Sequence, residues 1–184
     1  MKKQERALII SLIIFLLSFY LLLMDGGVGG DGISYYKVAQ SIIFNRALYV
    51  DGEGIPGIGG KMYLPYGIAY SIVMIPFYLW GLFVSKFLPF INQERIVMFS
   101  VSTINSFIST FLALALYSFS RKLGSSIRNA MIIVAVYVFT TMSWSYAKTT
   151  FCEPLNSLFI LSGVLSLYNY RLEQKKPKLF FAGV

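Results

Sequence analysis

The stretch that decides the fold is ALIISLIIFLLSFYLLLM, residues 7–24, which directly follows the basic N-terminus MKKQER. The stretch contains no charged residue, and about 20 apolar residues are enough for a helix to cross the hydrocarbon core of a bilayer. It is too long for the apolar part of a secretory signal peptide, and no A-x-A-like cleavage site follows it. The sequence therefore predicts an uncleaved first transmembrane helix.

The rest of the chain also has the composition of an integral membrane protein. Of the 184 residues, 57% are hydrophobic and 17% are aromatic, whereas a soluble domain is about 45–50% apolar. Further apolar runs predict spans at roughly 96–120, 129–145 and 154–170. The expected fold class is an all-α, multispanning helical bundle, with residues 1–184 forming a single membrane domain. An outer loop with amphipathic juxtamembrane helices is expected to complete it.

The net charge of +8 has two explanations. In a soluble protein it would suggest nucleic-acid binding. Here most Lys and Arg residues flank the apolar runs, as cytoplasmic anchors do, so we predict no nucleic-acid partner. The chain has no His and one cysteine, Cys152, which excludes His-based catalysis, His metal sites and a disulfide within it.

The positions of the cations also predict the topology. Lys and Arg prefer cytoplasmic loops, which places the basic N-terminus in the cytoplasm. If residues 67–90 crossed the membrane as well, the basic loops 121–129 and 171–178 would both lie outside, against this rule. Segment 67–90 also contains Pro76 and is rich in aromatic residues, which favour the membrane interface. We therefore predict a multi-pass cell-membrane protein in which this segment is re-entrant or interfacial.

This topology places the loop 25–95 and two carboxylates, Asp31 and Glu153, on the outer side. Charge near a bilayer is costly unless it has a role, and the chain has only eight acidic residues. Each carboxylate also has a structural explanation compatible with a functional one. Asp31 would cap the helix predicted after it, and Glu153 precedes Pro154, which suits a first helical turn.

The outer loop itself predicts a surface helix and a flexible segment. In GISYYKVAQSIIFNRAL, Ile33, Tyr36, Ile43 and Ala47 can share one helical face, while Ser34, Lys37, Ser41 and Asn45 point away from it. The following DGEGIPGIGG, residues 51–60, predicts a flexible loop that is either a lid or a solvated linker. KMYLPYG, residues 61–67, predicts a turn with interfacial aromatics or an aromatic surface for a lipid or sugar ring.

Taken in order, these stretches resemble the N-terminal part of the GT-C superfamily of membrane glycosyltransferases, as in protein mannosyltransferases and aminoarabinose transferases. The matching pieces are GGDGISYYKVAQSII, KMYLPYGIAYSIVMIPFYLWGL, ERIVMFSVSTINS, the RKLG loop and SYAKTTFCEPLNSLFILSG. The resemblance covers nearly the whole chain. Because relatives are several hundred residues long, it implies that this chain is an N-terminal fragment, whose activity alone is an open question.

The resemblance implies inverting transfer of a sugar from a polyprenyl-phosphate donor, held in the membrane lipid, to an acceptor hydroxyl or amine. Asp31 would be the catalytic base, and Glu153 matches a second acidic position of the family. Many relatives carry another acid directly after the first, where this chain has Gly32. This difference speaks against a mechanism that needs an adjacent acid pair.

Further residues have implied roles around the donor. The candidates for binding the leaving phosphate are Arg95, Lys61 and Lys148, in that order of preference. The candidate aromatic contacts to substrate are Tyr36, Tyr63 and Tyr66. Family members differ on whether Mg²⁺ or Mn²⁺ assists, and Asp31 with Glu153 offers too few ligands for a metal site.

Two other classes of function stay open. A secondary transporter would place polar groups on broken helices near mid-membrane, whereas the acids here lie at the ends of spans. A small structural or assembly protein with no catalytic activity is the second alternative. It explains the length of the chain best and the placement of the two carboxylates worst. The sequence identifies neither the sugar nor the acceptor.

Overall fold

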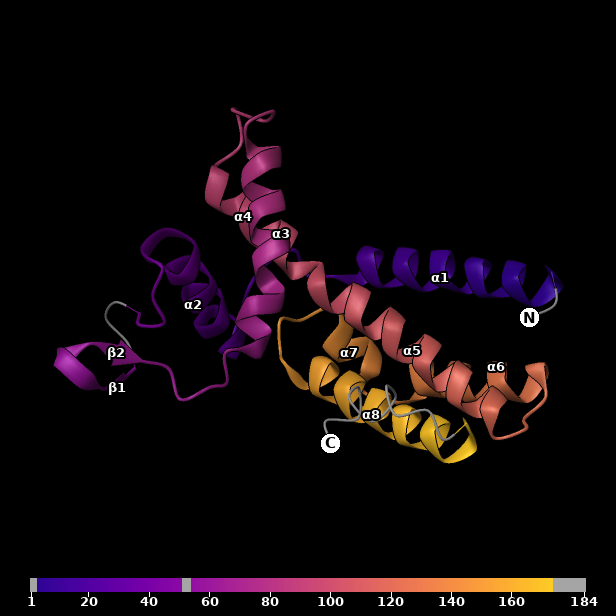
Figure 1. Cartoon of the computed structure of the whole chain (residues 1–184). Coiled ribbons are helices and arrows are strands. Elements are labelled where there is room, and N and C mark those ends of the chain that lie inside the picture. Colours follow the sequence, from indigo (N-terminus) through magenta and orange to yellow (C-terminus); the bar gives the residue numbers. More distant parts are fainter. Residues whose placement is uncertain (1–2, 51–53, 174–184) are drawn as a thin grey trace. The chain divides into compact units, whose positions relative to one another are not determined.

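The computed structural model describes residues 3–50 and 54–173 and is mostly helical (Figure 1), which confirms the predicted helical class. The chain divides into two compact units, which are described separately. Unit 1 comprises Met1–Leu23, Ser106–Ala147 and Glu153–Val184, and unit 2 comprises Met24–Asn105 and Lys148–Cys152.

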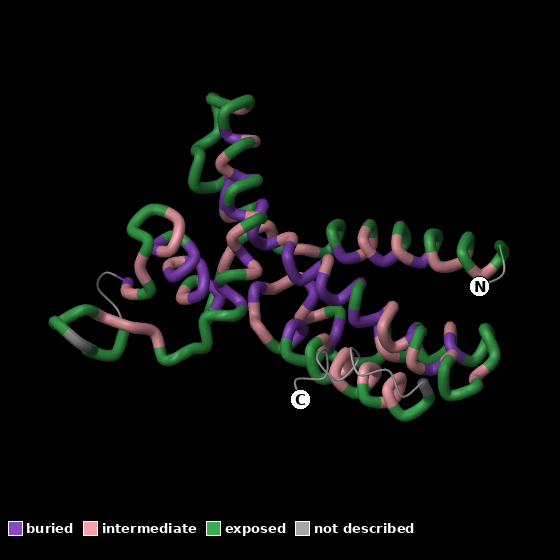
Figure 2. The backbone as a smooth tube through the Cα atoms, viewed as in Figure 1, coloured by how far each residue is buried: buried purple, intermediate pink, exposed green. Residues whose placement is uncertain are grey.

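Unit 1 is built from long apolar helices. Its elements are α1 (Lys3–Leu23), most of α5 (Ile104–Lys122), α6 (Ile127–Thr140), α7 (Ser143–Ala147) and α8 (Glu153–Glu173). Figure 2 shows that α1 is buried along one face. The side chains that form the core come from α1, α5, α6 and α7: Leu12, Leu16, Tyr20, Ala113, Tyr117, Ala130, Val134, Val138 and Ala147. The 3–4-residue spacing of these positions is that of amphipathic helices packed along their lengths.

Polar contacts at one end of unit 1 fix the directions of its helices. Glu5, in the first turn of α1, forms an ion pair with Arg121, in the last turn of α5, at 3.0 Å. The end of α5 also contacts the end of α8, where the Tyr168 hydroxyl donates to the Lys122 carbonyl at 3.3 Å and the Lys122 ammonium donates to Asn169. Helix α1 therefore runs antiparallel to α5, and α8 runs parallel to α5.

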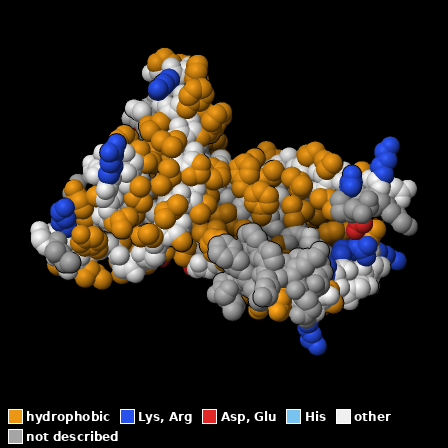
Figure 3. Space-filling model, viewed as in Figure 1, with side chains coloured by type: hydrophobic (Ala, Val, Ile, Leu, Met, Phe, Trp, Pro, Cys, Tyr) orange, Lys and Arg blue, Asp and Glu red, His pale blue; other side chains and the backbone are white. Residues whose placement is uncertain are grey.

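This arrangement concentrates positive charge at one end of unit 1. The described cations there are Lys3, Arg6, Arg121, Lys122, Arg128 and Arg171. In Figure 3, blue Lys and Arg side chains gather around the N-terminal end of α1. Among the described residues of unit 1, Glu153 is the single charged side chain at the opposite end, where α8 begins. Unit 1 is thus strongly asymmetric in charge along its helices.

Two helices are long and apolar enough to cross a membrane: α1 and the 30-residue stretch Gln93–Lys122, which contains α4 and α5. Only 17% of the residues in the apolar part of α1 are buried, and Ile14 and Leu22 are 61% and 85% exposed. Helices α3 and α6 are also apolar but are shorter than these two candidate spans. The predicted span 129–145 corresponds to α6, which ends at Thr140. The predicted span 154–170 corresponds to α8, which is not one of the two candidates.

Unit 2 carries the elements of the predicted outer loop. They are α2 (Asp31–Asn45), a hairpin of β1 (Ile55–Pro56) and β2 (Met62–Tyr63) enclosing η1 (Ile58–Gly60), then α3 (Ala69–Ser85) and α4 (Gln93–Ser102). Helix α3 contacts both α2 and α4. The predicted flexible segment 51–60 is therefore partly structured, since the hairpin begins at Ile55; residues 51–53 lie outside the described part.

Helices α3 and α4 approach each other closely. A Cβ atom at Gly81 would lie 2.7 Å from the Cα atom of Val97. The Ser100 hydroxyl of α4 donates a hydrogen bond of 2.7 Å to the Phe77 carbonyl of α3. The absence of a side chain at Gly81 thus permits direct packing of the two backbones.

One prediction about α2 is wrong. Asp31 is the first residue of the helix and not its cap, because Gly30, at φ 54°, already occupies the capping position without a side-chain hydrogen bond. The apolar face predicted for this helix stays a prediction, and Ile33 on that face is 41% exposed. Contact with α3 buries a different stripe of α2, through Tyr35 and Ala39.

Candidate functional site

Asp31 presents an exposed carboxylate at the N-terminus of α2, where the helix dipole favours negative charge. Its Oδ1 atom accepts a hydrogen bond from the Tyr66 hydroxyl at 3.2 Å. This hydrogen bond, together with the negative charge of Asp31, raises the pKa of Tyr66, because both favour the neutral phenol. The carboxylate is thus accessible and already engaged with one hydroxyl group.

The start of α2 rests directly on the segment 148–152. A Cβ atom at Gly32 would lie 1.9 Å from Oγ1 and 2.9 Å from the carbonyl oxygen of Thr150. The Thr150 hydroxyl in turn donates to the carbonyl of Gly29 at 3.5 Å. No side chain fits at Gly32 without moving this segment, which gives a physical reason why no second acid follows Asp31.

Asn105 holds the segment 148–152 in place. Its side chain is 0% exposed, and its Nδ2 atom donates to the carbonyls of Thr149 and Phe151, each at 2.8 Å. Its Oδ1 atom accepts from the Tyr70 hydroxyl at 3.0 Å. Asn105 is a residue of the site that the sequence motifs do not predict. The available signal was an amide inside an apolar helix, where buried polar groups need partners.

Aromatic rings line the space beside Asp31. The Tyr35 ring lies 5.4 Å from that of Tyr66 and 5.1 Å from that of Tyr70, and its hydroxyl donates to Sγ of Cys152 at 3.2 Å. Tyr35, Tyr63 and Tyr66 line a cavity of about 100 Å³. The buried hydroxyl of Ser71 also lines it and has no hydrogen-bond partner. The site therefore combines a carboxylate with an aromatic recess.

The predicted aromatic residues divide into two groups. Tyr63 and Tyr66 line the recess, as the sequence suggested. Tyr36 is 5% exposed and packs against the ring of Tyr78 at 5.2 Å, where it supports the α2–α3 contact. Burial at this position leaves Tyr36 little surface for a substrate.

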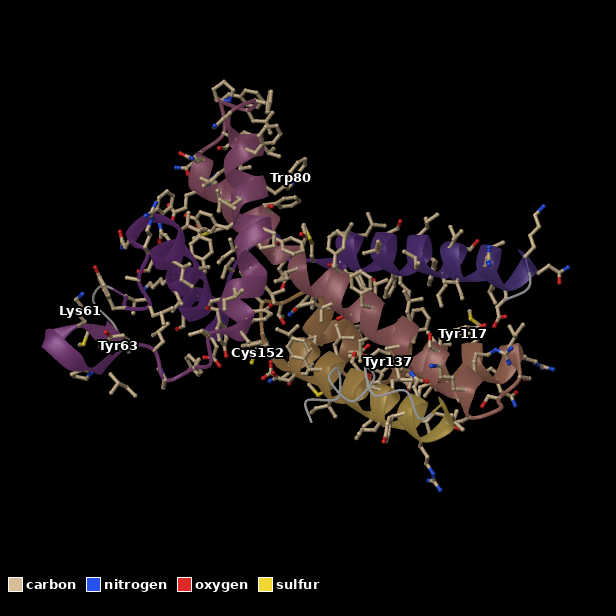
Figure 4. All side chains as sticks on the ribbon, in the orientation of Figure 1. Lys61, Tyr63, Trp80, Tyr117, Tyr137 and Cys152 are labelled. Carbon is tan, nitrogen blue, oxygen red and sulfur yellow. The ribbon has the colours of Figure 1, made fainter. Side chains whose placement is uncertain are left out.

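The three predicted phosphate-binding cations lie on different elements of unit 2. Lys148 lines a pocket of about 360 Å³ together with Asp25 and residues 27–29. Lys61, on the hairpin beside Tyr63 (Figure 4), places its ammonium 4.2 Å from the centre of the Tyr49 ring, a cation–π geometry. Arg95 is exposed in the first turn of α4, where Asn92 caps the helix. Lys148 thus has the most enclosed surroundings of the three.

Glu153 is the exposed first residue of α8, and Pro154 follows it in the first turn, as predicted. It lines a pocket of about 250 Å³ with Tyr137, Tyr146 and Ser157. Glu153 belongs to unit 1 and Asp31 to unit 2, so a site shared by the two carboxylates stays a prediction. Within residues 3–50 and 54–173, no group of three or more Asp, Glu, Cys or His residues could hold a metal ion.

No protein-family model, curated protein or solved structure matches the chain. The resemblance to GT-C glycosyltransferases stays a prediction from the sequence motifs.

Proposed function

We propose that this protein is a membrane glycosyltransferase of the GT-C type, which transfers a sugar from a polyprenyl-phosphate donor to an acceptor at the outer membrane face. The observation that carries the proposal is the exposed carboxylate of Asp31, which accepts a hydroxyl hydrogen bond beside an aromatic recess. A general base for sugar transfer needs such a position, within hydrogen-bond reach of an acceptor hydroxyl.

The Tyr66 hydroxyl marks where the acceptor would bind. It donates to Oδ1 of Asp31, as an acceptor hydroxyl would do before attack. In the transfer step the acceptor oxygen bonds to the anomeric carbon of the donor sugar, and the bond from that carbon to phosphate oxygen breaks. The acceptor proton passes to Asp31, and the phosphate leaves with the bonding electrons, next to a cation such as Lys148.

The charge asymmetry of unit 1 supports a membrane bundle in the predicted orientation. Six described cations occupy one end, as expected for a cytoplasmic face, and Glu153 occupies the other. The exposed apolar surface of α1 is suited to contact with lipid chains. In this proposal the helices of unit 1 cross the membrane, and unit 2 carries the reacting groups at the outer face.

The test is donor consumption by the purified protein in proteoliposomes. Polyprenyl-phosphate-linked hexoses and pentoses are supplied with an acceptor mixture, and release of polyprenyl phosphate is measured. We expect Asp31→Asn to lower the rate about 100-fold or more. Glu94→Gln is the matched control, since Glu94 is also an exposed acid in the first turn of a helix of unit 2. No donor consumption by the unmodified protein, or equal rates in the two variants, would reject the proposal.

A further inference from the structure

The basic end of unit 1 includes three cations that are available to a ligand. Lys3, Arg6 and Arg128 are exposed, and none of them makes a hydrogen bond or ion pair with a residue in 3–50 or 54–173. The nearby carboxylate of Glu5 does not neutralise them, because it is already paired with Arg121 at 3.0 Å. The fold therefore concentrates positive charge here and leaves part of it without a protein partner.

Arg128 lies at the start of an exposed apolar stripe on α6. Ile132 and Val136 follow it by four and eight residues, so the three side chains lie on one side of the helix. Both apolar side chains are 51% exposed. At the rise of an α-helix, the stripe is about 12 Å long. A guanidinium thus stands at one end of a strip of uncovered hydrocarbon.

Helix α1 repeats this arrangement. Arg6 is followed at the same spacing by Ile10 and Ile14, which are 57% and 61% exposed. The two helices start at the same end of unit 1, since α1 begins at the ion pair with the end of α5 and α6 begins after the turn that closes α5. They also pack side by side, with the rings of Phe15 and Phe139 6.5 Å apart. Two arginine-headed stripes therefore start from one basic end.

A cation followed by exposed hydrocarbon matches a molecule with a phosphate at one end and an acyl chain at the other. A guanidinium binds phosphate oxygens through paired N–H donors. Basic clusters at the cytoplasmic ends of membrane helices attract anionic lipids in the same way. A nucleic acid or a free phosphate would match the cations but would leave the apolar side chains uncovered. The combination of charge and apolar surface therefore favours a lipid.

We propose that the basic end of unit 1 binds anionic phospholipids, with the lipid phosphate at Arg128 or Arg6 and an acyl chain along the apolar residues that follow. The surface lies at the opposite end of unit 1 from Glu153, so it is separate from the reaction proposed at the outer face. The inference rests on the proposed membrane placement of unit 1, and it does not depend on sugar transfer.

The test is native mass spectrometry of the full, delipidated chain in detergent. The probes are dioleoylphosphatidylglycerol and dioleoylphosphatidylcholine, which share acyl chains and a phosphate but differ in net charge. We expect phosphatidylglycerol to bind at least five-fold more tightly, as one cation near a lipid phosphate provides. The double variant Arg6→Gln/Arg128→Gln should bind the two lipids equally. It should fold, because both guanidinium groups are exposed and neither has a partner in the described part of the chain.

Arg46→Gln is the matched control. Arg46 is also exposed, but it lies in unit 2, and the apolar residue four positions later, Val50, is only 4% exposed. This variant should keep the preference for phosphatidylglycerol. The inference is overturned if the unmodified chain shows no such preference, if the double variant retains it, or if Arg46→Gln loses it as well.

Two further comparisons separate this inference from its alternatives. Inorganic phosphate at the same concentration should not displace phosphatidylglycerol, and displacement would show that the site recognises free phosphate and not a lipid. Binding is measured without a sugar donor and without turnover. A failure here therefore leaves the proposed transfer reaction standing, and a failure of donor consumption leaves the lipid preference standing.

Discussion

Gly32 and Thr150 are in such close contact that a Cβ atom at Gly32 would lie 1.9 Å from Oγ1 of Thr150. We therefore expect Gly32→Ala to lower the free energy of unfolding by about 2 kcal/mol, as overpacking of a tight contact does. Gly27→Ala is the control, because a Cβ atom there meets nothing within 4 Å. Chemical denaturation followed by fluorescence measures the difference. Replacing Thr150 by Gly in the Gly32→Ala chain should restore part of the loss; equal stability of the two alanine variants would contradict this packing.

Asn105 should be essential for the conformation of segment 148–152. Asn105→Leu leaves the carbonyls of Thr149 and Phe151 without their donor, and we expect a loss of about 3 kcal/mol. The freed segment should also expose Cys152, so that maleimide reacts with it faster under native conditions. Asn129→Leu is the control, because Asn129 is exposed and contributes only its backbone N–H to the cap of α6. Unchanged Cys152 reactivity in Asn105→Leu would show that the segment does not depend on this amide.

The hydrogen bond between Tyr66 and Asp31 predicts a pH dependence. Its effect is to raise the pKa of Tyr66, so the neutral phenol is favoured in the folded protein. The bond should therefore stabilise the fold fully below the ordinary tyrosine pKa of about 10 and be lost as the pH rises through the higher folded value. Titration of a chain labelled with ¹³Cζ-tyrosine measures it, with the Tyr66 signal assigned from Tyr66→Phe. Asp31→Asn should lower the pKa of Tyr66; identical values in the two chains would exclude this pairing in solution.

Cysteine labelling tests the orientation of unit 1. In a Cys152→Ser background, Met142→Cys and Leu123→Cys place thiols at opposite ends of α6, at positions that are 66% and 57% exposed. A membrane-impermeant maleimide should label Met142→Cys in intact cells and Leu123→Cys only after permeabilisation. Labelling in the reverse order would invert the topology, and labelling of both in intact cells would show that unit 1 does not cross the membrane.

The apolar runs were sufficient to predict where most helices occur. The run at 7–24 became α1, and Glu153 with Pro154 opened α8 as expected. These features depend on local periodicity and on first-turn chemistry, which a sequence displays directly. The small hairpin at 55–63 was missed, because a Gly-rich segment shows little of the alternation that identifies strands.

The candidate site was harder to predict, because long-range packing decides which side chains are available. Tyr36 and Tyr66 looked equivalent in sequence, yet contact with Tyr78 buries the first, while the second reaches Asp31. Asn105 pairs with residues more than 40 positions later, so its importance could not be inferred from its neighbours. The unexpected cap at Gly30 likewise depends on a positive φ that the sequence GGVGG permits at several positions.

The close contact between α3 and α4 determines how this pair would behave in lipid. The Gly81–Val97 approach and the Ser100–Phe77 hydrogen bond depend on van der Waals packing and polar pairing, not on the exclusion of water. Their strength should therefore be largely retained when hydrocarbon replaces the aqueous surroundings. Trp80, which projects from α3 (Figure 4) and is 61% exposed, would meanwhile gain an apolar environment. In the predicted re-entrant or interfacial placement of residues 67–90, α3 and α4 would therefore meet the membrane as one packed pair.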